Sequence, residues 1–412
     1  MKTINIFTYD YPAHGNDSYF IEDELLMISS LFDKINVIPL KFNNNLKKNY
    51  INKDNINYDF SLSGRVYKLK NIIHIFFRLF VCKIFWKEIF KMHKKNSLKR
   101  TIMTIKERIL AENLFLWVVE KQIDKASNIF YSYWSNHTLL SFYLLKKKRI
   151  IDLTFARTHG NDLKGFIPYD DFVSFKEYKF QLLNILLVLN EGQINKLKEE
   201  KLISQKKVIK CYMGIEPQEI LIDNNKSKKI HFVSCGSLIH IKNTIQILKF
   251  IELTSNNLNN YEISYTCIGK GKDEDKIYNY ANSNFKKVNF KMINNVDNLV
   301  TFFKMNSVDF FINLSFSEGM SFAVMEAMSC SIPAICSKIP GNTEIVNNNN
   351  GYILESNSQK DMIILINNIK NDLEKNNIIK KKIIIKQTIE NQINRSISLN
   401  RMKNIVNDTF LK

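Results

Sequence analysis

Short apolar runs alternate with polar stretches along the first part of the chain. The pattern predicts a strand at Thr3–Tyr9, a loop at Asp10–Asp17, a helix at Tyr19–Phe32 and a second strand at Ile35–Leu40. A strand, a helix and another strand in this order are typical of a βαβ unit. The N-terminal region is therefore expected to form a parallel sheet covered by helices.

The same alternation continues through the rest of the sequence. Further strands are predicted at Ile129–Trp134, Ile150–Ala156, Ile230–Cys235, Ile263–Ile268, Val288–Met292, Val308–Leu314 and Ala334–Ser337. Helices are predicted at His137–Lys146, Thr244–Leu253 and Ser321–Ser329. With 412 residues the chain is long enough for two domains of about 200 residues each. The polar stretch Glu216–Lys229, which contains Pro217, marks the boundary between domains 1–217 and 218–394, followed by a C-terminal segment 395–412.

Composition limits the compartment and the partners. The six cysteines form no Cys-x-x-Cys pair and show no zinc-site spacing, so they are expected to be reduced residues of a cytoplasmic protein. The formal net charge of +19 calls for an anionic partner or surface. No nucleic-acid-binding motif is visible, so nucleic acid is not an expected partner. The uncharged stretch Ala126–Leu145 is interrupted by polar residues, and it predicts a strand and a helix instead of a membrane span.

A basic amphipathic helix is predicted within Asn71–Arg100, a segment with eight Lys or Arg residues and one Glu. At 100° per residue one face carries Val81, Phe85, Ile89 and Met92, and the opposite face carries Lys83, Lys87, Lys91 and Lys94. Such a helix can lie in the plane of an anionic membrane. It can equally be a surface helix whose apolar stripe packs on its own domain, and the sequence leaves both interpretations open.

The strongest candidate site follows the predicted strand Val308–Leu314. Glu318 lies four residues beyond this strand, Gly319 breaks the chain, and Glu326 lies on the next helix among apolar side chains. A carboxylate in apolar surroundings needs polar partners, which ligand hydroxyls can supply. The backbone N–H groups at the helix start (Gly319, Met320 and Ser321) favour a bound phosphate.

This segment resembles the Glu-x7-Glu motif of the retaining glycosyltransferases of family 4. The surrounding residues Ile332-Pro333, Pro340-Gly341 and Gly351 match the family pattern as well. An ordinary strand–loop–helix unit with a solvated Glu is the alternative, and it leaves these further matches unexplained. The resemblance implies an α/β fold of the GT-B type, with two Rossmann-like domains facing each other across a cleft. It also implies that the C-terminal helix, 395–412, packs back on the N-terminal domain.

Three glycine-containing loops extend the resemblance. After the strand Ile230–Cys235, Lys242 matches a family lysine, while Ser237 stands where an arginine is usual. Both are implied to lie at the donor diphosphate. Gly269 matches a family glycine near the donor, and Gly15 matches one near the donor phosphates or the acceptor. Asp273-Glu-Asp275 imitates a metal-binding Asp-x-Asp motif but lies at a helix start, where capping is the favoured interpretation. No metal and no cofactor are expected, because the nucleotide sugar is a substrate.

Arg157, His159 and Asp162 end a predicted strand, and α/β sheets bind ligands at the carboxyl ends of their strands. Arg157 and His159 are two residues apart, so they are expected to point the same way. His159 and Asp162 match a His-x-x-Asp pattern of the family. The resemblance implies that His159, Glu318 and Lys242 form the catalytic set and that Arg157 and Asp162 face the sugar or the acceptor.

The implied activity is retaining transfer of a sugar, of the hexosyltransferase type, from a UDP- or GDP-sugar to an acceptor. A lipid-linked saccharide in bacterial surface polysaccharide synthesis (capsule, O-antigen or lipooligosaccharide) is the expected acceptor, on the cytoplasmic face of the cell membrane. Two alternatives remain. One is an epimerase or phosphorylase with the same fold. The other is a catalytically silent GT-B module in a membrane-associated complex, because Ser237 and Ser331 replace a family arginine and glycine.

Overall fold

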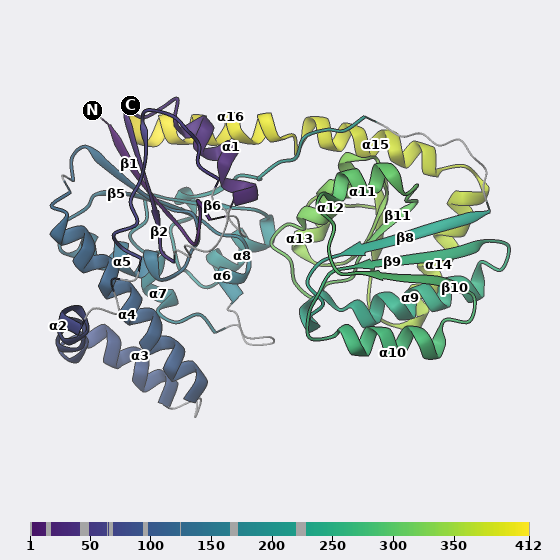
Figure 1. The fold of residues 1–412 in the computed structure, drawn as a ribbon, viewed down its shortest axis with the longest axis horizontal. Helices are drawn as coiled ribbons and strands as arrows, with labels where there is room; N and C mark the ends of the chain where they lie inside the picture. Colours follow the sequence, from purple (N-terminus) through teal and green to yellow (C-terminus); the bar gives the residue numbers. More distant parts are fainter. Residues whose placement is uncertain are drawn as a thin grey trace. The chain divides into compact units, whose positions relative to one another are not determined.

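The computed structural model describes residues 2–13, 18–41, 49–63, 65, 69–93, 98–123, 125–164, 172–219 and 228–411. These residues form two compact units (Figure 1). Unit 1 contains Met1–Tyr212 together with Leu399–Lys412, and unit 2 contains Met213–Ser398. The end of the chain therefore belongs to the same unit as its beginning.

Unit 1 is built on a parallel sheet with the order β3-β2-β1-β4-β5-β6-β7 in its described part. Its strands are β1 (Thr3–Thr8), β2 (Lys34–Pro39), β3 (Ile56–Tyr58), β4 (Asn128–Ser132), β5 (Leu153–Arg157), β6 (Ile185–Val188) and β7 (Val208–Lys210). β1 pairs in parallel with both β2 and β4, so the direction in which strands are added reverses between β1 and β4. Ligands of open α/β sheets bind at the carboxyl ends of the strands beside such a reversal.

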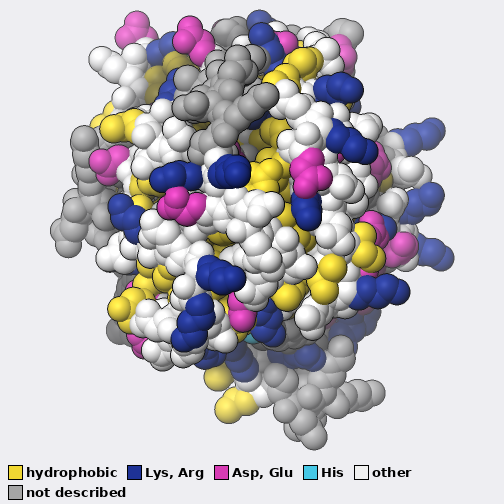
Figure 2. Space-filling view, turned by 90° about the vertical axis from the view of Figure 1, so that its right-hand side faces the viewer, with side chains coloured by type: hydrophobic (Ala, Val, Ile, Leu, Met, Phe, Trp, Pro, Cys, Tyr) yellow, Lys and Arg dark blue, Asp and Glu magenta, His cyan; other side chains and the backbone are white. Residues whose placement is uncertain are grey.

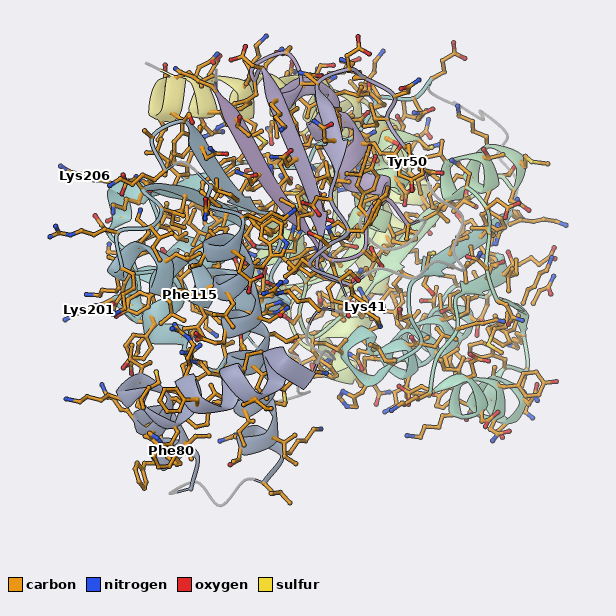
Figure 3. The ribbon with its side chains drawn as sticks, turned by 60° about the vertical axis from the view of Figure 1, so that its left-hand side comes forward. Lys41, Tyr50, Phe80, Phe115, Lys201 and Lys206 are labelled. Atoms are coloured by element: carbon orange, nitrogen blue, oxygen red, sulfur yellow. The ribbon has the colours of Figure 1, made fainter. Side chains whose placement is uncertain are left out.

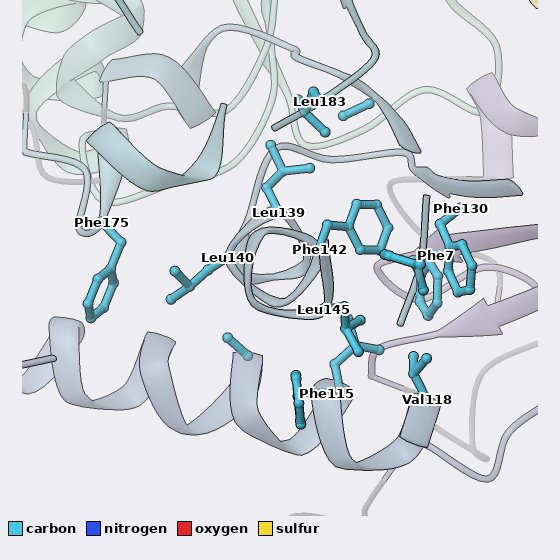
Figure 4. Packing of buried hydrophobic residues seen from close by; sticks show 14 of the residues in the cluster. Phe7, Phe115, Val118, Phe130, Leu139, Leu140, Phe142, Leu145, Phe175 and Leu183 are labelled. Atoms are coloured by element: carbon cyan, nitrogen blue, oxygen red, sulfur yellow. The ribbon is translucent and has the colours of Figure 1, made fainter. Parts of the chain in front are cut away.

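Helices cover both faces of this sheet. They are α1 (Ser18–Ile28), α2 (Leu69–Phe80), α3 (Lys83–His93), α4 (Leu98–Glu120), α5 (His137–Lys147), α6 (Asn161–Lys164), α7 (Lys176–Lys179) and α8 (Glu191–Glu199). On one face Phe142 of α5 lies beside Phe7 and Phe130 of the sheet (Figure 4), and Phe115 of α4 belongs to the same buried cluster. On the other face α1 and the C-terminal helix α16 (Arg395–Val406) pack on the strands. The ring of Phe410, just beyond α16, lies 5.2 Å from that of Phe155 in β5.

Helix α3 turns its predicted lipid-facing stripe inward. Phe85 is buried in the core, Ile89 packs against it, and Val81 precedes the helix, which begins at Lys83. On the predicted basic face, Lys91 Nζ lies 2.7 Å from a carboxylate oxygen of Glu177. Of the two interpretations of this helix, packing of the apolar stripe on its own domain is therefore the correct one for Phe85 and Ile89. Lys94 and the side chain of Met92 lie outside the described residues.

Unit 2 repeats the same topology with the order β10-β9-β8-β11-β12-β13. Its strands are β8 (Lys229–Cys235), β9 (Glu262–Ile268), β10 (Val288–Ile293), β11 (Phe310–Asn313), β12 (Ala334–Ser337) and β13 (Gly351–Leu354). Its helices are α9 (Thr244–Asn257), α10 (Glu274–Asn284), α11 (Leu299–Met305), α12 (Phe322–Ser329), α13 (Pro340–Thr343), α14 (Gln359–Glu374) and α15 (Ile378–Asn391). All strand pairs are parallel, and the reversal falls between β8 and β11. Each unit is thus a Rossmann-like α/β domain.

Three general properties of the described chain bear on function. None of its helices is long and apolar enough to span a bilayer. Lysine and arginine side chains are scattered over the face shown in Figure 2 without forming one continuous patch. The six cysteines are all free.

Candidate functional site

The topological reversal of unit 2 brings Lys242 and Glu318 together. Lys242 ends a short 3-10 turn, His240–Lys242, in the loop after β8, and Glu318 lies in the loop after β11. Because β8 and β11 are adjacent parallel strands, both loops leave the same edge of the sheet. Lys242 Nζ donates a hydrogen bond of 2.7 Å to Glu318 Oε1. The structure therefore places two predicted catalytic residues in direct contact at the position where α/β sheets bind ligands.

The Glu318 carboxylate is held by three donors at one oxygen. Besides Lys242, the Ser315 hydroxyl donates to Oε1 at 2.7 Å and the Asn313 side-chain amide at 3.3 Å. No donor among the described residues bonds Oε2. The side chain is only 10% exposed, so the carboxylate keeps one fixed orientation with one oxygen open to a ligand.

Asn313 links this carboxylate to the start of helix α12. Its side-chain amide also donates to the hydroxyl of Ser321 at 3.0 Å, and its Oδ1 accepts from the Ser315 backbone N–H at 3.2 Å. Ser321 occupies the N-cap position of α12 but makes no side-chain bond to the helix backbone. The N–H groups of the first helical turn have no partner within a helix, so they remain suited to an anion.

Close packing of the next loop explains Gly341. A Cβ atom at this position would lie 2.3 Å from the carbonyl oxygen of Glu318 and 2.9 Å from that of Gly319. Gly319 is itself buried, while Met320 is half-buried. The start of α13 thus packs directly against the loop that carries Glu318. Only glycine fits at position 341 without displacing that loop.

Glu326 lies half-buried on α12, and its charge affects the pKa of Cys235 at the end of strand β8. Burial raises the pKa of the Cys235 thiol to about 12, with a further rise from Glu326 and an opposing effect of Lys242. Burial and the nearby Glu318 likewise raise the pKa of Cys336. The charges of both carboxylates of the Glu-x7-Glu motif are therefore felt by cysteines at the carboxyl ends of the strands, where Lys242 bonds Glu318.

Gly269 fixes the loop that carries Ser237. A Cβ atom on Gly269 would lie 1.9 Å from the carbonyl oxygen of Gly236, and its φ of 146° is one that other residues rarely adopt. The Leu238 backbone N–H donates to the Lys270 carbonyl at 2.8 Å, which ties the two loops together. Ser237 is exposed in the loop so formed. The predicted Gly-x-Gly turn therefore has a packing role next to the Lys242 turn.

In unit 1 the carboxylate of Asp162 organises the loop after β5. It accepts hydrogen bonds from the backbone N–H groups of Ser135, His159 and Gly160 and from the Thr158 hydroxyl, at 2.5–3.1 Å. Asp162 is buried, with both oxygens engaged. The structure thus gives Asp162 a positioning role in the loop that carries His159, and its contact with sugar or acceptor stays a prediction.

His159 is held in one tautomer by this loop. Its Nε2 lies 2.9 Å from the Tyr133 carbonyl oxygen, which can only accept, so Nε2 carries the proton and Nδ1 the lone pair. The ring packs on Trp134 with a centroid distance of 4.1 Å. Burial, assisted by Arg157 and opposed by Asp162, lowers the pKa of His159 to about 4. The imidazole is therefore neutral at pH 7 and offers Nδ1 as an acceptor.

Arg157 lies inside unit 1, which differs from the prediction. Its guanidinium bonds Glu24 at 3.0 Å, the Cys211 carbonyl at 3.0 Å and the Met402 sulfur at 3.3 Å, and its side chain is 2% exposed. The argument that Arg157 and His159 share a face fails because β5 ends at Arg157 and His159 belongs to the loop. Gly15, the predicted glycine of the first loop, lies outside the described residues.

Sequence reasoning assigned no function to Asn313, Ser315 or Tyr133, although they hold Glu318 and His159 in place. The only sequence feature that could have indicated such a role is the polar pair Asn313 and Ser315 at the end of an apolar strand. Polar side chains there are either exposed or bonded to a neighbour, and only the structure identifies that neighbour.

Residues 217–385 match the family model described as "Glycosyl transferases group 1". The match contains Lys242, Glu318 and Glu326 and covers most of unit 2. The matched segment is less than half of the 412-residue chain. Comparison with the curated proteins gives no match.

Solved structures with the same fold span the whole chain. The lipopolysaccharide outer core galactosyltransferase WaaB is 15% identical, with a TM-score of 0.67 and 99% of each chain covered. Sucrose-phosphate synthase from Thermosynechococcus elongatus is 10% identical, with a TM-score of 0.69 and 100% of each chain covered. A mutant of S. aureus TarM, in complex with fondaparinux, alpha-GlcNAc-glycerol and UDP, is 16% identical, with a TM-score of 0.57 and 72% of this chain covered. The match spans only 59% of that TarM chain. These likenesses show that the chain has the GT-B fold.

Proposed function

We propose that the protein is a retaining glycosyltransferase of family 4 that transfers a sugar from a nucleotide diphosphate sugar to a saccharide acceptor. The observation that carries the proposal is the Lys242–Glu318 pair at the reversal of the unit 2 sheet, 2.7 Å apart. A cation beside a fixed carboxylate suits a ligand that presents both phosphate and hydroxyl groups. The match of residues 217–385 to a glycosyltransferase model supports the same assignment.

Each group of unit 2 has a distinct role in the proposed donor site. Lys242 has three N–H donors and uses one for Glu318, so the others can bond oxygens of the diphosphate. The first-turn N–H groups of α12 add a second anion-binding element. The open Oε2 of Glu318 can accept from a sugar hydroxyl, and Glu326 can accept from the two ribose hydroxyls. Ser237, exposed in its loop, can donate to phosphate but lacks the charge of an arginine.

The proposed reaction is a front-face displacement. The acceptor oxygen forms a bond to the anomeric carbon on the side from which the phosphate oxygen leaves, and the acceptor proton passes to that phosphate. Lys242 and the α12 amides stabilise the charge that develops on the leaving diphosphate. A neutral His159 contributes Nδ1 as a hydrogen-bond acceptor for a sugar hydroxyl. No metal enters the proposal, and among the described residues no group of three His, Cys, Asp or Glu could hold one.

Related structures favour a uridine nucleotide and a cell-surface acceptor. The TarM mutant structure contains UDP with alpha-GlcNAc-glycerol, and Anabaena HepE was solved with UDP. WaaB is an outer core galactosyltransferase of lipopolysaccharide. We therefore propose a UDP-sugar as donor, with GDP-sugars as the second choice. The proposed acceptor is a saccharide, free or lipid-linked, in bacterial capsule, O-antigen or lipooligosaccharide synthesis at the cytoplasmic face of the membrane.

Nucleotide release by the purified protein tests the proposal. A panel of UDP- and GDP-sugars is incubated without acceptor, and the released UDP or GDP is measured. We expect slow release from one donor and its loss in Lys242→Gln. The matched control is Lys338→Gln, which breaks a lysine–glutamate pair of similar length, 2.6 Å, at an exposed position. Absence of release from every donor would favour the catalytically silent module. Interconversion of two nucleotide sugars without release would favour an epimerase.

A further inference from the structure

Helix α2 has apolar side chains on two different faces. Ile75 and Leu79 point into the core and are 1% and 4% exposed. Ile73, Phe77 and Phe80 recur at i, i+4 and i+7 on another face and are 64%, 69% and 73% exposed. A surface helix of a water-soluble domain normally shows polar residues on its outer side. Three large exposed apolar side chains in one row therefore indicate a surface that binds another molecule.

The exposed row continues onto helix α3. The ring of Phe80 lies 6.3 Å from that of Trp86, and Trp86 lies 6.4 Å from Phe90, which is 62% exposed. The indole N–H of Trp86 donates to the Phe80 carbonyl at 2.8 Å, which ties the end of α2 to α3. Phe80 points away from the ribbon, whereas Phe115 of α4 lies among neighbouring side chains (Figure 3). We call Ile73, Phe77, Phe80, Trp86 and Phe90 the outer aromatic face.

The chain segment around the outer aromatic face is rich in basic residues. Residues 71–100 contain eight Lys or Arg and one acid, Glu88. Glu88 is buried, where it accepts from the Phe175 backbone N–H at 3.1 Å, so it does not offset this charge at the surface. Lys83 and Lys99 are exposed, whereas Lys87 and Lys91 are directed to Glu177. Aromatic side chains with lysines beside them suit the boundary between lipid chains and anionic headgroups.

We propose that the outer aromatic face is a docking surface for an anionic lipid bilayer, with Phe77 and Phe80 entering the headgroup region. The aromatic rings leave water for the acyl boundary, and Lys83 and Lys99 remain at the anionic headgroups. This surface replaces the inward-facing stripe of Phe85 and Ile89 that the sequence suggested. The inference rests on the proposed function for its lipid-linked acceptor, but the lipid contact itself does not depend on catalysis.

Co-sedimentation of the full chain with vesicles tests the proposal. Vesicles of phosphatidylcholine alone and with about one third phosphatidylglycerol are compared at low and high salt. We expect binding to the anionic vesicles that weakens with salt because exposed charges are screened. In Phe77→Gln/Phe80→Gln the partition coefficient should fall at least about tenfold, since two rings no longer leave water. The two positions are exposed, so the variant should keep the wild-type melting temperature.

Matched variants separate the lipid contact from general effects. Met305→Gln/Ile383→Gln changes two exposed apolar side chains of unit 2 and should bind vesicles like the wild type. Lys83→Gln/Lys99→Gln should reduce the salt-dependent part of vesicle binding. Lys198→Gln/Lys206→Gln changes two exposed lysines elsewhere in unit 1 and should leave that part unchanged. Absence of wild-type binding to anionic vesicles, or equal binding by Phe77→Gln/Phe80→Gln, would overturn the proposal.

Two further readouts distinguish lipid docking from self-association and from a loss of catalysis. If light scattering shows a dimer that Phe77→Gln/Phe80→Gln converts to monomer, with no vesicle binding, the face is an interface with a second copy and the lipid proposal is wrong. Nucleotide release without acceptor should be unchanged in Phe77→Gln/Phe80→Gln. If this variant loses vesicle binding but keeps nucleotide release, the result supports lipid docking independently of catalysis. If the wild type binds vesicles but releases no nucleotide, the proposed function is wrong and the lipid proposal stands.

Discussion

Ser315→Ala should lower turnover by loosening the Glu318 carboxylate. The substitution removes one of three donors to Oε1, the 2.7 Å bond from the Ser315 hydroxyl. Lys242 at 2.7 Å and Asn313 at 3.3 Å remain, and the Asn313 bond is long. The smaller side chain introduces no clash, so the change is confined to this hydrogen bond.

The expected magnitude follows from the surroundings of that bond. A hydrogen bond to a charged group contributes about 1.5–3 kcal/mol. Because two donors remain on the same oxygen, the lower end applies, and about 1.5 kcal/mol corresponds to roughly a tenfold loss of rate. The expected signature is a fall in kcat with little change in the affinity for UDP, since Glu318 is assigned to the sugar.

The assay is steady-state release of UDP from the accepted donor, combined with a thermal melt. Ser264→Ala is the matched control, because the Ser264 hydroxyl bonds a backbone carbonyl in the same sheet at 3.4 Å. A double-mutant cycle with Asn313→Ala, which removes another donor to the same Glu318 oxygen, should show a coupling of about 0.5–3 kcal/mol, as expected for side chains that share a partner. Turnover within twofold of the wild type at an unchanged melting temperature would refute the claim that Ser315 orients Glu318 for catalysis.

Three further predictions concern neighbouring parts of the two units. Gly341→Ala should destabilise the protein by about 1–3 kcal/mol in urea unfolding, because its Cβ would lie 2.3 Å from the Glu318 carbonyl oxygen; an unchanged midpoint would contradict the packing argument. Glu326→Gln should weaken UDP binding by about 1–3 kcal/mol in calorimetry, and equal affinity would remove the ribose assignment. The pKa of His159 falls from 6.5 to about 4 on folding, so the unfolded chain binds the extra proton first, and this residue destabilises the fold as pH drops from about 6.5 to 4. His159→Gln should therefore gain stability relative to the wild type between pH 7 and pH 5, and a pH-independent difference would contradict the neutral, buried imidazole.

Much of the strand pattern could be predicted from the sequence, because parallel strands buried on both faces are continuous apolar runs. Ala334–Ser337 was predicted with the bounds that the structure shows. Strand β3, with three residues and one exposed position, carries too little pattern to be recognised. The long helix α4 was also missed, because it is apolar on more than one side where it enters the core.

The site could be predicted only as far as its residues lie in local motifs. Glu318 and Lys242 were predicted because their local sequences resemble family motifs, whereas their contact depends on the adjacency of β8 and β11. Arg157 was assigned wrongly because the alternation of side chains applies within a strand and not beyond its end. For α2 and α3, apolar residues occur on two faces, and the sequence does not indicate which face meets the core.

The central claim is retaining transfer from a nucleotide sugar, and proton NMR of donor hydrolysis tests it most directly. The purified protein is incubated with its accepted UDP-α-sugar, and the anomeric signals are followed before mutarotation mixes them. The account predicts that the first free sugar is the α anomer and that Lys242→Gln abolishes its appearance. Initial formation of the β anomer, or equal hydrolysis by Lys242→Gln, would contradict it.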